Sequence, residues 1–130
     1  MGTGIDIIEI DRIKRVLYRH QGFVDRFFDP EEAAYYRRRN MNISSIAGGF
    51  AAKEAVVKAM GTGFTVFGWK DIVICRDDKG RPAVGLRGSA RTLCSAAGIE
   101  EILVSISHSR DYAIAQAIAL GGVRHEGCNP

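Results

Sequence analysis

The segment from Ile46 to Met60 limits most strongly what this chain can fold into. It is rich in alanine, contains no proline, and its only charged side chains are Lys53, Glu54 and Lys58. On a helical wheel its apolar side chains leave no polar face, and a helix that is apolar nearly all round is usually buried. We therefore expect one central helix against which the other segments pack.

Glu54 is the side chain of this helix that most needs an explanation. Glu54 and Lys58 are four residues apart, so they project from the same side of the helix. One interpretation is a partly exposed ion pair that stabilises the helix by roughly a few tenths of a kcal/mol. The other is a functional acid held by a metal ion or a cation, because an isolated buried carboxylate is very costly.

Length and composition predict one globular domain over residues 1–120, followed by a polar tail over 121–130. Of the 130 residues, 46% are hydrophobic and 25% are charged, as in ordinary globular domains. No apolar run is long enough to span a membrane, and the N-terminus lacks the basic start of a secretory signal. The cysteines, Cys75, Cys94 and Cys128, are far apart and form no CxxC pair, which predicts reduced thiols in a cytoplasmic protein and no zinc site.

The distribution of charge is more informative than its total. The formal net charge is +3, but basic residues crowd into 12–19 and 37–39. This clustering predicts an acidic partner on one face of the protein. A nucleic-acid partner is disfavoured, because the chain is far less basic than most nucleic-acid-binding domains and its aromatic residues do not alternate with the basic ones.

Residues 3–10 predict a strand that carries an unexpected acid. Alternation along the strand places Asp6 on the same face as Ile8 and Ile10. Because aspartate is depleted in strands, Asp6 needs a role. Either it caps the helix that follows, or it is a second carboxylate facing the same site as Glu54.

The next helix is predicted to begin after Asp11, as its N-cap, and to run to about His20. Arg12, Arg15 and Arg19 line up on one side of it. The usual meaning of such a row is a solvated face. The functional interpretation is a docking surface for an acidic helix.

The remaining pattern predicts an α+β fold, with a small antiparallel sheet of about four strands packed on the long central helix. Asp29-Pro30 is a strong helix start after a turn-rich link at 22–28. Further elements are expected as strands at 71–76, 82–86, 101–109 and 112–120 and as a short helix at 88–97. Alternate residues from 113 to 119 are alanine, so we expect the central helix to pack closely on that face.

Gly61, Thr62 and Gly63 follow the central helix directly. One glycine is enough to end a helix. Two glycines around a threonine would also let backbone N–H groups approach a phosphate. The turn is therefore a candidate phosphate-binding segment, although alone it is a weak signal.

The two acids allow two kinds of chemistry. Asp6 and Glu54 are compatible with an acid/base dyad of the glycosidase type or with oxygen ligands for Mg²⁺. Lys58, the glycine turn and His108 add cationic and N–H groups, and this combination favours Mg²⁺-dependent phosphoryl-type transfer. Taken alone, His108 is more often a structural histidine at the end of a strand.

Four segments resemble the holo-acyl-carrier-protein synthases, the short single-domain 4′-phosphopantetheinyl transferases. They are GIDIIEIDRI (4–13), FAAKEAVVKAMGTG (50–63), KGRP (79–82) and VSISHSRDYAIAQAIA (104–119). They occur in the same order as in that family and extend over nearly the whole chain. The combination of Gly-x-Asp with Ala-Lys-Glu-Ala is the most specific part of the resemblance.

The resemblance implies an enzyme that transfers the 4′-phosphopantetheine group of coenzyme A to a serine of apo acyl carrier protein and releases adenosine 3′,5′-bisphosphate. It implies that Asp6 and Glu54 bind Mg²⁺, that Lys58 lies near the pyrophosphate, and that His108 contacts coenzyme A. It leaves open whether Glu54 or a water on the metal takes the serine proton. It also leaves open whether the carrier serves fatty-acid or polyketide synthesis.

The resemblance further implies how the enzyme meets its partners. The helix with Arg12, Arg15 and Arg19 matches the one on which this family docks the acidic carrier. Family members form homotrimers in which each site is shared between neighbouring subunits, so a homotrimer is expected here.

Gly49 departs from the family pattern, because many members carry arginine or another polar residue at this position. If that side chain contacts coenzyme A or a neighbouring subunit, we expect Arg76 or Lys53 to replace it. A non-catalytic module that binds coenzyme A or a nucleotide is the alternative function. Retention of both acids and of Lys58 argues against it, because binding alone would not need the acids.

Overall fold

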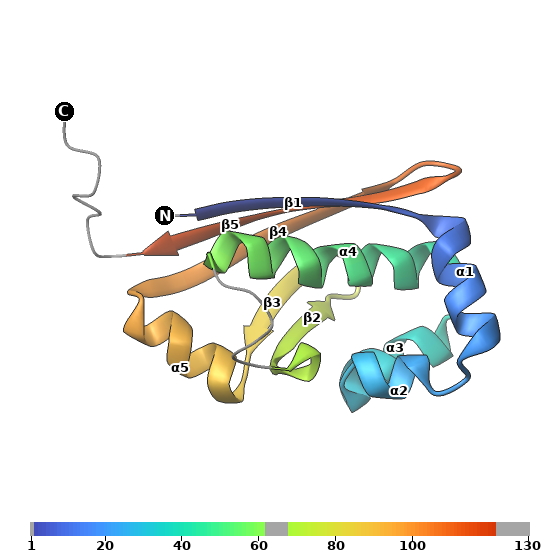
Figure 1. Cartoon of the computed structure of the whole chain (residues 1–130), viewed down its shortest axis with the longest axis horizontal. Coiled ribbons are helices and arrows are strands. Elements are labelled where there is room, and N and C mark those ends of the chain that lie inside the picture. Colours follow the sequence, from blue (N-terminus) through green and yellow to red (C-terminus); the bar gives the residue numbers. More distant parts are fainter. Residues whose placement is uncertain (1, 62–67, 122–130) are drawn as a thin grey trace.

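The computed structural model describes residues 2–61 and 68–121 (Figure 1). The helices are α1 (Ile10–Arg19), α2 (Phe23–Phe27), α3 (Pro30–Arg38), α4 (Ile43–Met60) and α5 (Gly88–Ala96), with a 3-10 turn η1 (Trp69–Asp71). The strands are β1 (Gly2–Glu9), β2 (Ile72–Arg76), β3 (Pro82–Leu86), β4 (Ile99–His108) and β5 (Tyr112–Gly121). Among the described residues, none of the helices combines the length and apolar character that crossing a membrane requires.

The predicted central helix is α4, which lies across the middle of the molecule (Figure 1). It begins at Ile43, slightly before the predicted Ile46, because the Asn42 side chain accepts a hydrogen bond from the Ser45 amide at 2.9 Å and caps the helix. It ends at Gly61, whose φ of 79° is a left-handed conformation that glycine adopts without strain.

Strands β1, β5 and β4 form an antiparallel sheet in that order, and α4 packs against one of its faces (Figure 1). The predicted alanine face of β5 is confirmed, because its members are at most 1% exposed: Ala113, Ala115, Ala117 and Ala119. Asp6 on β1 pairs with Ala115 on β5, which in turn pairs with Ile106 on β4. Asp6 therefore lies at the β1 edge of this sheet, and Ile106 lies at the β4 edge.

The strands divide between two sheets, whereas the sequence predicted one. β2 and β3 pair with each other in a separate antiparallel sheet. β3 passes close to β4 without pairing with it. The α+β class is confirmed, but the number of sheets was wrong, because strand alternation does not reveal which strands pair.

Two smaller expectations near the N-terminus are corrected. α1 starts at Ile10 with Glu9 in the N-cap position, so Asp11 lies inside the first turn and is not the cap. The predicted link at 22–28 contains the helix α2, in which Val24 and Phe27 are buried. An aromatic cluster forms there, and its packing stabilises the helix although the local sequence favours a helix only weakly.

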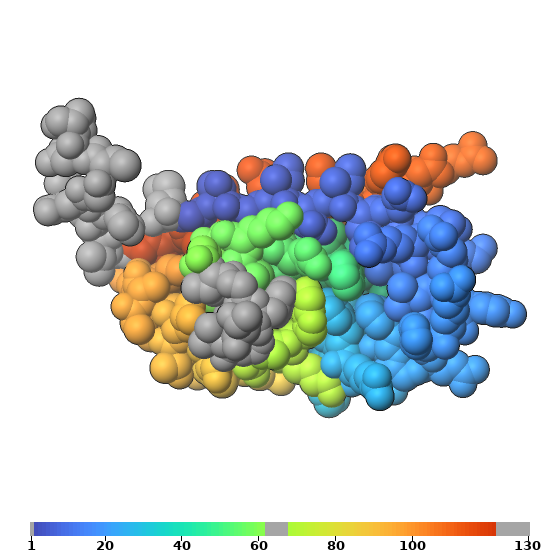
Figure 2. Space-filling view, in the orientation of Figure 1, coloured from blue at the N-terminus to red at the C-terminus, as the bar shows by residue number. Residues whose placement is uncertain are grey.

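The outer face of the three-stranded sheet, opposite α4, is apolar and exposed. Ile5 and Ile7 on β1 are 58% and 60% exposed, and Leu103 on β4 and Ile114 on β5 are also exposed. Figure 2 shows side chains of β1 and of the C-terminal strands standing along the upper surface of the molecule. Four large apolar side chains on one face form the kind of patch that marks an interaction surface.

Candidate functional site

Asp6 and Glu54, distant in sequence, line the same cavity. This cavity has a volume of about 310 Å³, and its wall includes Arg12, Phe23 and Phe50. Asp6 comes from the inner face of β1, and Glu54 comes from the side of α4 that packs on that strand. The two predicted acids therefore meet between the strand and the central helix.

Gly4 explains how β1 comes close enough to α4 for this meeting. A Cβ atom at Gly4 would lie 2.1 Å from the carbonyl oxygen of Ala55 and 2.7 Å from the amide nitrogen of Ala59. Both atoms belong to the backbone of α4, so they cannot move aside alone. The glycine of the Gly-x-Asp motif is thus required by close packing, two residues before the acid that it positions.

We expect Gly4→Ala to destabilise the fold by about 1–3 kcal/mol, as overpacking in a tight interior does. The free energy of unfolding, measured with a denaturant, tests this. Gly22→Ala is the matched control, because a Cβ atom at Gly22 meets nothing within 4 Å. Equal stabilities for the two variants would contradict the close approach of β1 and α4.

Electrostatics at the site favour the binding of a cation. Burial raises the pKa of Glu54, and the nearby charge of Asp6 raises it further. Lys58 and Arg12 oppose these effects, but more weakly. Two carboxylates that repel each other in one cavity are stabilised by any positive ion placed between them.

Lys58 contacts the site through Asp6. Its Nζ donates hydrogen bonds to Asp6 Oδ1 at 3.1 Å and to the carbonyl oxygen of Ile5 at 3.0 Å. The side chain of Asp6 is only 13% exposed, whereas that of Lys58 is 53% exposed. Glu54 and Lys58 therefore do not form the simple ion pair that the sequence allowed, because the Lys58 ammonium is bonded to β1.

The donor set fits a magnesium ion that is shared with a phosphate ligand. No group of three or more histidine, cysteine, aspartate or glutamate side chains suited to a metal occurs among residues 2–61 and 68–121. Mg²⁺, however, is commonly bound by only one or two carboxylates, with phosphate oxygens and waters completing its shell. Asp6 and Glu54 supply such a pair, and the cavity leaves space beside them.

His108 lies away from the acids. It is exposed at the end of β4 and lines a second cavity, of about 620 Å³, at the β4 edge of the sheet. Arg38, Arg39 and Arg76 line the same cavity, which we call the basic basin. The sequence had placed His108 with Asp6, but the width of the sheet, two strand spacings of roughly 4.8 Å each, separates them.

Arg38 and Arg39 were not identified as residues of this site from the sequence. The run 37–39 predicted an acidic partner on one face, and the end of a helix dipole also accounts for basic residues there. In the structure Arg37 pairs with Asp25 at 2.8 Å, while Arg38 and Arg39 face the basin. Three consecutive arginines are more than one helix end needs, and this excess was the available signal.

Tyr36 explains why residue 49 is glycine. A Cβ atom at Gly49 would lie 1.9 Å from the Tyr36 hydroxyl, so the tyrosine fills the space of any side chain there. Of the two basic residues considered as replacements, Lys53 is excluded because it is fully buried elsewhere. Arg76 lines the basin, and its buried Nε has no hydrogen-bond partner among the described residues. A buried N–H without a partner in a basic cavity is suited to an anion.

The three arginines of α1 differ in their surroundings. Arg12 lines the acid cavity, whereas Arg15 forms an exposed ion pair with Asp11 at 3.4 Å. Arg19 is exposed at the end of the helix.

The predicted phosphate-binding turn is described only in part. Gly61 caps α4, and Thr62 and Gly63 lie outside the described residues.

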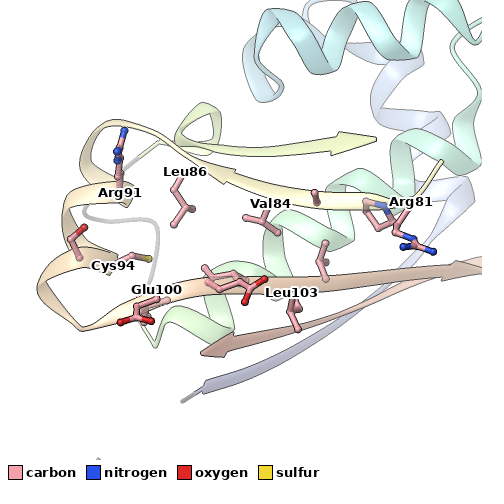
Figure 3. A pocket seen from close by; sticks show the side chains of 14 residues that line it. Arg81, Val84, Leu86, Arg91, Cys94, Glu100 and Leu103 are labelled. Atoms are coloured by element: carbon pink, nitrogen blue, oxygen red, sulfur yellow. The ribbon is translucent and has the colours of Figure 1, made fainter. Parts of the chain in front are cut away.

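A third hollow lies between β3 and β4 and is closed at one end by α5 (Figure 3). Its volume is about 570 Å³, and Val84, Leu86 and Cys94 are among the residues that line it. Arg81 and Arg91 lie toward its opposite ends (Figure 3). None of the predicted site residues that the structure describes lines this hollow.

Comparison with known proteins identifies the relatives of this chain. The model of the 4′-phosphopantetheinyl transferase superfamily matches residues 2–117. A holo-[acyl-carrier-protein] synthase from Alkaliphilus oremlandii is 50% identical over 119 residues, which cover 92% of this chain and 98% of the relative.

Solved structures of similar proteins agree in fold. A holo-ACP synthase from Plasmodium yoelii superposes with a TM-score of 0.82 at 34% identity, covering 94% of this chain and 95% of that one. The holo-[acyl-carrier-protein] synthase from Helicobacter pylori, solved in complex with coenzyme A, gives a TM-score of 0.80 at 33% identity over 91% of this chain and 99% of that one.

Proposed function

This chain belongs to the 4′-phosphopantetheinyl transferase superfamily, and from that premise we propose that it transfers the 4′-phosphopantetheine group of coenzyme A to a serine of apo acyl carrier protein. The reaction is Mg²⁺-dependent and releases adenosine 3′,5′-bisphosphate. The observation that carries the proposal is the meeting of Asp6 and Glu54 in one cavity, with Lys58 bonded to Asp6.

The chemistry replaces a phosphoanhydride bond with a phosphoester bond. The serine hydroxyl gives its proton to a base, and its oxygen forms a bond to the β-phosphorus of coenzyme A. The anhydride bond from that phosphorus to the bridging oxygen breaks, and this oxygen leaves with adenosine 3′,5′-bisphosphate. Asp6 and Glu54 would hold Mg²⁺, which, when bound, offsets negative charge on the diphosphate. Lys58, more than half exposed, is placed to donate hydrogen bonds to phosphate oxygens from the Asp6 side of the cavity.

The proposal includes a homotrimer in which neighbouring subunits share each site. The acids lie at the β1 edge of the sheet, and the basic basin lies at its β4 edge. Coenzyme A carries both a diphosphate and a 3′-phosphate, so one molecule needs both kinds of group. The exposed apolar face with Ile5 and Ile7 supports association of subunits, which would bring one copy's β1 edge to the next copy's β4 edge.

The carrier would dock on α1, beside the acid cavity. Acyl carrier proteins are acidic, and the exposed row of Arg12, Arg15 and Arg19 is complementary in charge. Arg12 lies nearest to the chemistry because it lines the cavity.

The cytoplasm is the proposed location, in keeping with Cys75 and Cys94, which are both free thiols.

We expect Arg19→Glu to raise the KM for the carrier by about tenfold or more, because it reverses a charge at the docking face outside the acid cavity. The KM for coenzyme A should stay nearly unchanged. Steady-state kinetics with each substrate varied in turn measures both values. Arg91→Glu, at an exposed arginine on α5, is the control. Equal losses for both substrates would count against docking on α1.

The function itself is tested by incubating the protein with apo acyl carrier protein, coenzyme A and Mg²⁺ and measuring the intact mass of the carrier. The expected result is a gain of one phosphopantetheine group that requires all three components. If coenzyme A binds but no carrier gains mass, the protein is a binding module and the proposal is wrong.

A further inference from the structure

Lys53 is a fully buried cation beside Glu54 to which the proposed chemistry gives no role. Its side chain is 0% exposed. Its Nζ lies 2.7 Å from Glu32 Oε1 and donates hydrogen bonds to the carbonyl oxygens of Phe27, at 3.1 Å, and Trp69, at 2.9 Å. Three acceptors from three different segments thus converge on one ammonium group of α4.

Glu32 connects this cluster to the N-cap of its own helix and to one further segment. Its carboxylate accepts hydrogen bonds from the amides of Asp29, at 3.1 Å, and Ile74, at 3.0 Å. Through Glu32, Lys53 is therefore connected to the start of α3 and to β2. Every acceptor around the ammonium is fixed by backbone structure, so the position of the Lys53 side chain is closely defined.

Stability alone is a poor explanation for such a pair. Burial raises the pKa of Glu32 and lowers the pKa of Lys53, while their mutual attraction opposes both shifts. Removing two charges from water costs about as much as their attraction returns, so well-packed apolar residues are often as stabilising as a buried ion pair. The role of the pair is therefore better explained by the geometry that it enforces.

The Phe27 carbonyl bonded by Lys53 belongs to a residue that supports the acid cavity. The Phe27 ring stacks on Phe50 with centroids 4.8 Å apart, and on Phe23 with centroids 5.3 Å apart. Phe50 and Phe23 both line the cavity that contains Glu54. We call these three rings the aromatic wall. A continuous series of contacts therefore leads from Lys53 to the surroundings of the acid.

We propose that Lys53 is a positioning residue, whose buried ammonium fixes the aromatic wall and the rotation of α4 so that Glu54 faces Asp6. The kinetic part of this inference rests on the proposed transferase function, whereas the structural part does not. Lys53 touches no substrate in this assignment. It acts on the reaction only through the shape of the cavity.

The test compares Lys53→Met with the double variant Lys53→Met/Glu32→Gln. The single variant leaves Glu32 as a buried charge without its cation, so it should lose much stability. The double variant removes both charges and should regain part of that loss. We expect kcat to stay lower by about tenfold to a hundredfold in the double variant, because a small misplacement of catalytic groups has an effect of that size. KM values should change little.

Fluorescence gives a readout that does not depend on activity. Trp69 is the chain's one tryptophan, and its ring lies 4.1 Å from the Phe27 ring between centroids. Its emission should shift in both variants if the aromatic wall moves. Arg37→Met, which breaks the exposed pair with Asp25, is the control and should change neither emission nor kcat.

Each outcome decides the inference. If the double variant recovers kcat together with its melting temperature, Lys53 is merely structural and the proposal is overturned. If the wild type transfers nothing, the proposed function fails, and Trp69 emission still decides whether Lys53 holds the wall. Unchanged emission in the folded double variant would refute positioning whatever the kinetics show.

Discussion

Replacing Glu54 with glutamine should abolish transfer while the protein stays folded. The amide keeps the shape of the side chain but cannot supply the charge that holds a divalent cation. Metal-assisted charge stabilisation contributes several kcal/mol to catalysis, so kcat/KM should fall by about a thousandfold or more. The intact-mass assay on apo carrier protein measures the loss.

Stability should move in the opposite direction to activity. The pKa of Glu54 is raised, which means that folding disfavours its charged form. A neutral glutamine removes this penalty, so thermal unfolding of Glu54→Gln should show an equal or slightly higher melting temperature. Glu101→Gln, on the exposed side of β4, should change neither property. Near-normal turnover in Glu54→Gln would overturn the assignment of Glu54 as a metal ligand.

The central helix and the face of Asp6 could be predicted because their signals are local. The apolar wheel of α4 identifies a buried helix, and the alternation in β1 identifies the face of Asp6. The alanines of β5 then show which strand the helix covers. These features place Asp6 and Glu54 on elements that pack together, but they left the role of each acid open, and only the family resemblance paired the two. In the structure both acids line one cavity.

The partners of Lys53 could not be predicted, because they come from three distant segments. The sequence shows a lysine beside a glutamate on an apolar helix, and nothing near it indicates a bond to Glu32 or to the carbonyl of Trp69. Gly49 could not be explained from the sequence for the same reason, because the Tyr36 hydroxyl occupies the space that a side chain at position 49 would need. Contacts of this kind depend on tertiary packing, which no local pattern records.

The separation of His108 from the acids also depends on topology. The sequence gives no strand order, and only the order β1-β5-β4 puts the acids and the basic basin at opposite edges. The residues that were predicted to form one site therefore lie in two separate cavities of a single subunit. That division has a direct experimental consequence for mixed oligomers.

Two inactive variants should regain activity when their subunits assemble together. Glu54→Gln lacks the acid site but keeps its basic basin. A second variant, Arg39→Glu/His108→Glu, places two negative charges in the basin at exposed positions and keeps its acids. In the proposed trimer, one interface of a mixed assembly would join intact acids from one copy to an intact basin from the next. Co-expressed subunits should therefore transfer phosphopantetheine well above the sum of the two separate variants.

The control pairs Glu54→Gln with Asp6→Asn, whose lesions lie in the same cavity. No arrangement of these two subunits contains an intact acid pair, so their mixture should stay inactive. If each site were complete within one subunit, the first mixture would also stay inactive, because neither of its chains has both an intact acid pair and an intact basin. Recovery in the first mixture and its absence in the control would together require that one coenzyme A molecule is bound by two copies of the chain.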